Sequence, residues 1–137
     1  MAGADSTHGG AYALAQSVPA TPANVSELRH AVCDLARRAG AGDLVLADVA
    51  LAVGEACGNA ALHAYPAGED GPLHVHACVE NGALVVEIAD QGRGLVPRSG
   101  SQGLGLGLPL MSALARDIRV GPGPGGRGTG IELRFDL

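Results

Sequence analysis

The sequence predicts an α/β fold, a two-layer sandwich in which helices pack on one face of a mainly antiparallel mixed sheet. Two segments, residues 23–39 and 44–63, carry apolar residues at helical spacing. Farther along, Asn81-Gly82 separates two runs of alternating apolar residues, which is the pattern of a β-hairpin. Because hairpins take the place of the regular crossovers of a parallel sheet, we expect the helices to cover one face only.

The length of 137 residues is that of one domain. We expect this domain over residues 11–137, behind a polar, Gly-rich tail of residues 1–10. Its first element is a strand over residues 11–18, which Pro19 ends.

Two helices follow this strand. Residues that favour helix starts and ends flank both segments: Thr21 or Asn24 before the first and Gly40 after it, Asp43 before the second and Pro66 after it. The second helix, residues 44–63, is apolar on nearly every side, so we expect it to be buried.

The predicted hairpin joins strands over residues 73–80 and 83–90. Side chains alternate between the two faces of a strand, so Asp90 shares a face with the apolar residues before it, Leu84, Val86 and Ile88. The Asp90 carboxylate therefore ends an apolar row and should point toward the helices.

The last third of the chain is rich in glycine. The expected elements are a loop over 91–107, a short helix with Pro109 in its first turn that ends near residue 115, and strands over 118–120 and 131–135 joined by a Gly/Pro-rich connection over 121–128.

Composition argues against several classes of partner. The net charge is −5, and the nine cationic side chains are arginines scattered along the chain, so no basic stripe could follow a nucleic acid. No apolar run approaches the ~20 residues of a membrane span. Cys33, Cys57 and Cys78 form no closely spaced pair, as expected of buried thiols in a reducing compartment, and we expect a cytoplasmic protein.

A polar stripe crosses the second helix. Glu55, Asn59 and His63 recur every four residues and drift by only ~40° per step. Such groups need partners in a core, so the stripe should face a pocket that holds water, metal or ligand. Alternatively, Glu55 and Asn59 bond to neighbouring loops, the glycines Gly54 and Gly58 serve helix packing, and His63 bonds to the terminal carbonyls of its helix.

Two glycine motifs follow the hairpin. Asp90-Gln91-Gly92-Arg93-Gly94 comes directly after a buried strand, where its glycines let the backbone pass close to a flat ligand and the carboxylate can accept from an amine. Gly103, Gly105 and Gly107 precede a helix start, where free N–H groups and the helix dipole favour a phosphate.

The order and spacing of these motifs resemble a known superfamily. Four motifs follow one another along the chain: Glu55-x-x-x-Asn59, Asp90-x-Gly92-x-Gly94, Gly103 to Gly107, and Gly128-Thr129. They are similar to the N, G1, G2 and G3 boxes of the Bergerat-fold ATPases, which include gyrases and histidine kinases. Within this superfamily, the stretches Glu55-Ala56-Cys57-Gly58-Asn59-Ala60 and His63-Ala64-Tyr65-Pro66 resemble the anti-sigma factor serine kinases.

For the phosphate end, the resemblance implies that Asn59 holds Mg²⁺ through its amide oxygen and that Glu55 is the general base. Gly103, Gly105 and Gly107 would form the lid over the phosphates of ATP. These roles agree with the chemistry, because Mg²⁺ prefers oxygen ligands and keeps several waters. Phosphoryl transfer needs mainly positioning and one carboxylate that orients the attacking hydroxyl.

For the adenine end, the resemblance implies that Asp90 accepts from the adenine amino group, beside the close backbone of Gly92 and Gly94. Thr129 would support the same base. It has the parity of Ile131 in the last strand, so it shares the inner face with Asp90 if that strand extends so far.

The function that the resemblance implies is an ATP- and Mg²⁺-dependent anti-sigma factor that binds a sigma factor and phosphorylates a serine or threonine of an antagonist protein. The resemblance is also compatible with a homodimer. Two alternatives remain: a nucleotide-sensing module that sequesters a regulatory partner without transferring phosphate, and a stand-alone ATP hydrolase domain.

Overall fold

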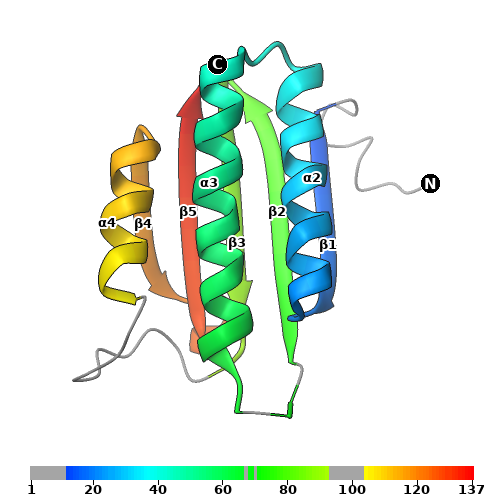
Figure 1. Ribbon diagram of the computed structural model, residues 1–137, viewed down its shortest axis with the longest axis vertical. Coiled ribbons are helices and arrows are strands. Elements are labelled where there is room, and N and C mark those ends of the chain that lie inside the picture. Colours follow the sequence, from blue (N-terminus) through cyan, green and yellow to red (C-terminus); the bar gives the residue numbers. More distant parts are fainter. Residues whose placement is uncertain (1–11, 67, 70, 93–103) are drawn as a thin grey trace.

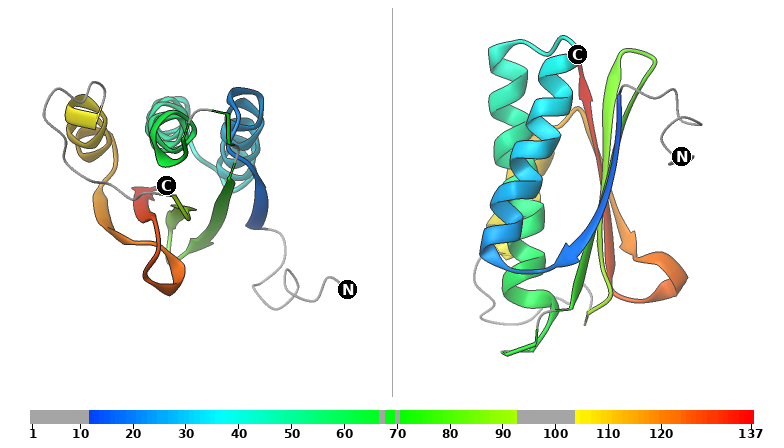
Figure 2. Two further views of the ribbon diagram at one scale, coloured as in Figure 1. Left: turned by 90° about the horizontal axis from the view of Figure 1, so that it is seen from below. Right: turned by 90° about the vertical axis from the view of Figure 1, so that its right-hand side faces the viewer.

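The computed structural model describes residues 12–66, 68–69, 71–92 and 104–137. The strands form a five-stranded sheet in the order β1-β2-β3-β5-β4, in which every neighbouring pair is antiparallel. Helices α2, α3 and α4 lie side by side on one face of the sheet (Figures 1 and 2). The predicted two-layer α/β sandwich is therefore confirmed, and its described strands are antiparallel throughout.

The chain enters the sandwich through β1 (Ala13–Pro19) and α2 (Pro22–Arg38). Thr21 is the N-cap of α2, and its hydroxyl oxygen accepts from the Asn24 N–H at 3.2 Å. Asn24, the alternative cap, instead donates its side-chain amide to the Pro19 carbonyl at 2.8 Å. The turn between the strand and the helix is thus fixed from both sides.

The second helix is α3 (Asp43–Asn59), which continues into a π-helical turn, η1 (Ala60–Ala64). The prediction that Asp43 caps this helix was wrong, because Gly42 is the N-cap and Asp43 is the first helical residue. A carboxylate in the first turn still interacts favourably with the helix dipole. The widened turn was not predicted, and it begins directly after Asn59.

Together α3 and η1 span 22 residues, Asp43–Ala64, and an 18-residue window in them has a mean hydropathy of 1.4. By length and composition alone this stretch could cross a membrane, contrary to the expectation that no run approaches that length. Core helices of globular domains pass the same test, and α3 packs between α2 and α4 over the sheet (Figure 1). Its inner residues, among them Val49, Val53 and Cys57, are fully buried.

The predicted hairpin consists of β2 (Pro72–Glu80) and β3 (Ala83–Asp90). Asn81 and Gly82 have φ angles of 54° and 75°, as a two-residue type I′ turn requires. The inner row of β3 is buried as expected, and it consists of Leu84, Val86, Ile88 and Asp90.

Helix α4 (Leu104–Leu114) includes Gly105 and Gly107, which were expected in the loop before it. Pro109 consequently lies inside the helix and not in its first turn. The alternation of glycine and leucine before Pro109 predicted a loop, because glycine disfavours helix formation. Burial outweighs that cost, since Met111 is fully buried and Leu108 packs against the core.

The last two strands are longer than predicted, β4 (Asp117–Pro122) and β5 (Thr129–Asp136). Gly121 pairs with Gly130 and Pro122 with Thr129, so part of the expected connection belongs to the sheet. A short 3₁₀ turn, η2 (Pro124–Gly126), lies between the strands. Because β5 begins at Thr129, this side chain does share the inner face with Asp90.

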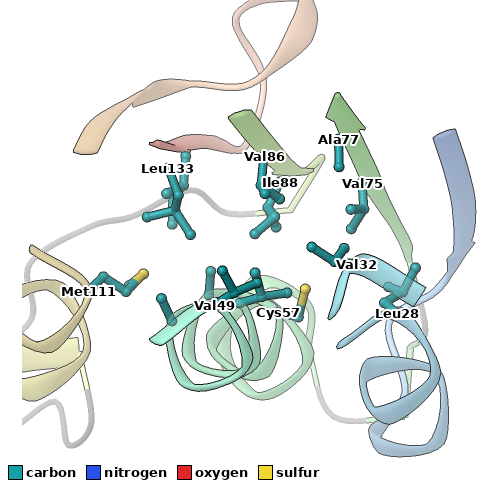
Figure 3. Close-up of a cluster of buried hydrophobic side chains, with 14 of the residues drawn as sticks. Leu28, Val32, Val49, Cys57, Val75, Ala77, Val86, Ile88, Met111 and Leu133 are labelled. Atoms are coloured by element: carbon teal, nitrogen blue, oxygen red, sulfur yellow. The ribbon is translucent and has the colours of Figure 1, made fainter. Parts of the chain in front are cut away.

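The core fills the space between the helices and the sheet (Figure 3). It contains small and medium side chains from every layer: Leu28 and Val32 of α2, Val49 and Cys57 of α3, Met111 of α4, and Val75, Ala77, Val86, Ile88 and Leu133 of the sheet. Burial raises the pKa of the Cys57 thiol to about 12, so it is an inert part of this core. All three cysteines are free, as predicted, although Cys33 and Cys78 are only half-buried.

Leu133→Ala should lower the free energy of unfolding by about 2–5 kcal/mol, because it removes a fully buried side chain and leaves a cavity. Leu44→Ala is the matched control, since Leu44 is 85% exposed, and it should change stability by less than about 0.5 kcal/mol. Urea unfolding followed by circular dichroism measures both. Similar losses for the two variants would contradict the described core.

Candidate functional site

The carboxylate of Asp90 organises one end of the sandwich. Asp90 is the last residue of β3 and is only 7% exposed. Its Oδ1 atom accepts from the Gly92 N–H at 2.9 Å and from the Thr129 N–H at 3.3 Å. Within the described parts of the chain no donor is bound to Oδ2. Both of the described bonds to the carboxylate therefore involve the same oxygen, Oδ1.

Thr129 comes to this carboxylate from the first position of β5. Its side chain is 5% exposed on the inner face, and its N–H donates to Asp90. The structure therefore brings together the two residues that the resemblance assigns to adenine.

Two glycines permit the close packing around Asp90. A Cβ on Gly128, which has a φ of 68°, would lie 2.8 Å from Asp90 Oδ1 and would overlap the Asp90 carbonyl. A Cβ on Gly92 would overlap the Ala64 carbonyl at the end of η1. Gly92 was expected to make room for a ligand, and here it makes room for the helix end. Gly128 belongs to the predicted motif Gly128-Thr129 but was given no role of its own. Its place directly before a strand is the sequence feature that could have indicated this close backbone approach.

The helical side of the site comes from α3. Glu55 and Asn59 are both half-buried, one turn apart. The Asn59 Nδ2 atom is buried and has no hydrogen-bond partner. This orphaned atom argues against the alternative in which Asn59 simply bonds to a neighbouring loop, because an unpaired buried donor costs about 1–3 kcal/mol.

Asn59 is chemically suited to the role of magnesium ligand. A half-turn of its amide would exchange the oxygen and the nitrogen and put a hard oxygen donor at the orphaned position. No group of three or more His, Cys, Asp or Glu side chains that could hold a metal ion lies among the described residues. A magnesium ion at Asn59 would therefore take its other ligands from phosphate and water.

The glycines of α3 have different surroundings. A Cβ on Gly54 would lie 3.4 Å from the Arg29 side chain of α2, an ordinary van der Waals contact, so packing against α2 does not require a glycine at this position. A Cβ on Gly58 would meet nothing within 4 Å. His63 lies half-buried in η1.

The predicted lid falls mostly outside the described part of the chain. Gly94 and Gly103 belong to residues 93–103, which the structure does not describe. Gly105 and Gly107 lie in the first turn of α4, whose backbone N–H groups lack acceptors within a helix. This turn, η1, the end of β3 and the start of β5 share the lower end of the molecule in Figure 1.

Two shallow hollows, of about 420 and 410 Å³, lie on the other face of the sheet. Residues of β1, β2 and β3 line the first, and it includes Ser17, whose hydroxyl is 2.7 Å from His74 Nδ1. Neither hollow includes Glu55, Asn59, Asp90 or Thr129. The convergence of polar groups, and not the volume of a hollow, locates the candidate site.

Comparison with solved structures shows the same fold in two bacterial proteins. The crystal structure of the RsbU and RsbW domains of Rv1364c from Mycobacterium tuberculosis superposes with a TM-score of 0.71 and 24% identity, over 91% of this chain and 32% of that one. The histidine kinase domain of the EL346 blue-light activated histidine kinase from Erythrobacter litoralis gives 0.53 and 22%, over 88% of this chain and 62% of that one. The chain thus spans about a third of the first structure.

No curated protein matches the sequence. The model of one protein family does, the histidine kinase-like ATPase domain, over residues 18–135. This match includes Glu55, Asn59, Asp90 and Thr129, and it runs from the end of β1 into β5. The chain is therefore a member of the histidine kinase-like ATPase domain family.

Proposed function

We propose that the chain is a cytoplasmic anti-sigma regulatory factor that binds ATP with Mg²⁺ and transfers the γ-phosphoryl group to a serine or threonine of an antagonist protein. The observation that carries the nucleotide site is the presence of two polar groups on elements that meet at the Ala64–Gly92 contact: the buried Asp90 carboxylate on β3 and the unpartnered Asn59 amide nitrogen on α3. The sequence motifs around Glu55 and His63 support the anti-sigma assignment through their resemblance to that group of kinases.

In this proposal the adenine lies at the end of the sheet. Asp90 Oδ2 accepts from the exocyclic amine, while Oδ1 stays bonded to the Gly92 and Thr129 N–H groups. An ionised acceptor makes a stronger hydrogen bond than a neutral one. Guanine has a carbonyl oxygen at the position where adenine has this amine, so it presents an acceptor to the carboxylate there. Selectivity for adenine would therefore depend on one carboxylate.

The phosphates lie between α3 and the first turn of α4. Asn59 supplies one oxygen ligand for Mg²⁺, and the N–H groups of Gly105 and Gly107 face the negative charge. A bound magnesium ion would neutralise charge that develops on the phosphoryl oxygens. Glu55, one turn before Asn59 on α3, accepts the proton of the attacking hydroxyl.

The test of the whole proposal is isolation of the full chain from its own cells with ATP or with ADP, followed by identification of the proteins that co-purify. The expected result is a sigma factor and an antagonist whose retention depends on the nucleotide. The antagonist should then take up label from γ-labelled ATP. Release of free phosphate without any acceptor would indicate a hydrolase, and nucleotide-dependent binding without label transfer would indicate a non-catalytic module.

Glu55→Ala should retain ATP binding and lower the rate of label transfer to the antagonist by about 10²- to 10⁴-fold, because the general base is lost. Glu87→Ala is the matched control, since this carboxylate is exposed on β3. Single-turnover labelling at saturating ATP measures the rate. Full activity of the Glu55 variant would remove this residue from the mechanism.

Asp90→Asn should weaken ATP binding by about 1.5–3 kcal/mol, the range for a hydrogen bond to a charged group. Calorimetry with ATP and GTP measures affinity and selectivity, and the preference for ATP should fall. Asp117→Asn, at an exposed position in β4, should change neither quantity. An unaltered ATP-to-GTP ratio in the Asp90 variant would contradict the adenine assignment.

Asn59→Ala should weaken ATP binding in the presence of Mg²⁺ and leave binding in a chelator nearly unchanged. Because the amide nitrogen has no partner in the described structure, the variant should lose no more than about 1 kcal/mol of its free energy of unfolding, and it should gain stability if the unpaired donor is costly. Calorimetry with and without chelator measures the first effect, and urea unfolding measures the second. Equal weakening in both conditions would exclude a role as metal ligand.

A further inference from the structure

We propose that Tyr65 is a positioning residue for adenine recognition, because its hydroxyl holds the backbone that directly follows Asp90. This inference rests on the proposed function and deepens it. Tyr65 lies immediately after η1, and from sequence it is only a member of the motif His63-Ala64-Tyr65-Pro66, with no role of its own.

The Tyr65 hydroxyl joins two strand ends. It donates to the Pro72 carbonyl at 2.5 Å and accepts from the Gln91 N–H at 2.8 Å. Pro72 opens β2, and Gln91 is the first residue after β3. Both hydrogen-bonding capacities of the hydroxyl are therefore used to connect these two positions.

The Tyr65 hydroxyl makes these two hydrogen bonds at the point where the pairing between β2 and β3 ends. The last pair between β2 and β3 is Leu73 with Asp90, so the next pair would be Pro72 with Gln91. Proline has no N–H to donate to that pair. The hydroxyl satisfies the Pro72 carbonyl and the Gln91 N–H in place of the missing rung, and it thereby sets the point at which the chain leaves the sheet beside the Asp90 carboxylate.

The ring is held as firmly as the hydroxyl. A Cβ on Gly71 would overlap the Tyr65 ring, so the chain before β2 passes directly against it. The preceding residue, Ala64, places its carbonyl where a Cβ of Gly92 would lie. Two consecutive residues after Asp90 thus contact the end of the helix: Gln91 contacts Tyr65, and Gly92 contacts Ala64.

Electrostatics keep the bridge intact. Burial raises the pKa of the Tyr65 hydroxyl, and the charge of Asp90 adds to this effect, while the hydrogen bond from the Gln91 N–H opposes it. The hydroxyl therefore keeps its proton throughout the physiological range. A neutral hydroxyl can donate and accept at once, as the bridge requires.

Tyr65→Phe tests this role, because it removes the hydroxyl and keeps the ring. We expect ATP and ADP to bind about 3- to 10-fold more weakly, on the scale of one lost hydrogen bond, with a smaller effect on GTP. Label transfer at saturating ATP should stay within about twofold, so the apparent KM for ATP rises while kcat does not change. Tyr12→Phe is the matched control, since Tyr12 is the other tyrosine and is 42% exposed.

A second readout examines the bridge itself. Amide hydrogen exchange of Gln91, measured by NMR without nucleotide, should be faster in the Phe variant than in the wild type. Gly71→Ala displaces the ring by another route, and it should reproduce the adenine-selective loss even if Tyr65→Phe fails to fold.

The outcomes separate the two proposals. Wild-type protein that binds neither ATP nor ADP would refute the proposed function. If the wild type binds ATP, unchanged affinities in folded Phe and Gly71 variants would overturn the role of Tyr65 alone. Equal weakening of ATP and GTP would also overturn it, since it would reveal a structural effect without any link to adenine.

Discussion

A buried carboxylate must be hydrogen-bonded, and at one end of this sandwich that requirement determines where three parts of the chain meet. Asp90 stands at the end of an apolar strand, so its charge is stable there only because N–H groups from the following loop and from β5 point at Oδ1. The approach of β5 is so close that Gly128 has no space for a side chain, and the end of η1 leaves none at Gly92. The rest of the candidate site is arranged around this carboxylate.

The helix opposite shows the complementary situation. Most of α3 is apolar and supplies the centre of the core, so a polar atom on its flank is costly unless something binds it. Asn59 carries such an unpaired atom, and the helix widens into a π turn directly after it. Single π turns occur often at functional sites. Among the described residues, the fold therefore tolerates this unsatisfied group at the position that we propose for a nucleotide-bound cation.

Local patterns predicted the hairpin, the buried row ending at Asp90 and the sheet-covering helices, because alternation and helical spacing are properties of short segments. They failed where distant segments decide the outcome. The bond between Asp90 and Thr129 joins positions 39 residues apart, and that between Gln91 and Tyr65 joins positions 26 apart. Likewise, the glycines of α4 read as a loop, and only the burial of Met111 against the core explains the helix.

The two halves of the candidate site belong to different layers, and one segment connects them. Asp90 and Thr129 lie on the sheet, whereas Glu55 and Asn59 lie on α3. The end of η1 touches the sheet side twice, through the Ala64 carbonyl at Gly92 and the Tyr65 hydroxyl at Gln91. A nucleotide that spans both layers needs their separation to be held closely, and a backbone contact together with a side chain that is bonded at both ends of its hydroxyl can provide this. Under the proposed function, the short run from Asn59 to Tyr65 would therefore join recognition of the base to chemistry at the phosphate.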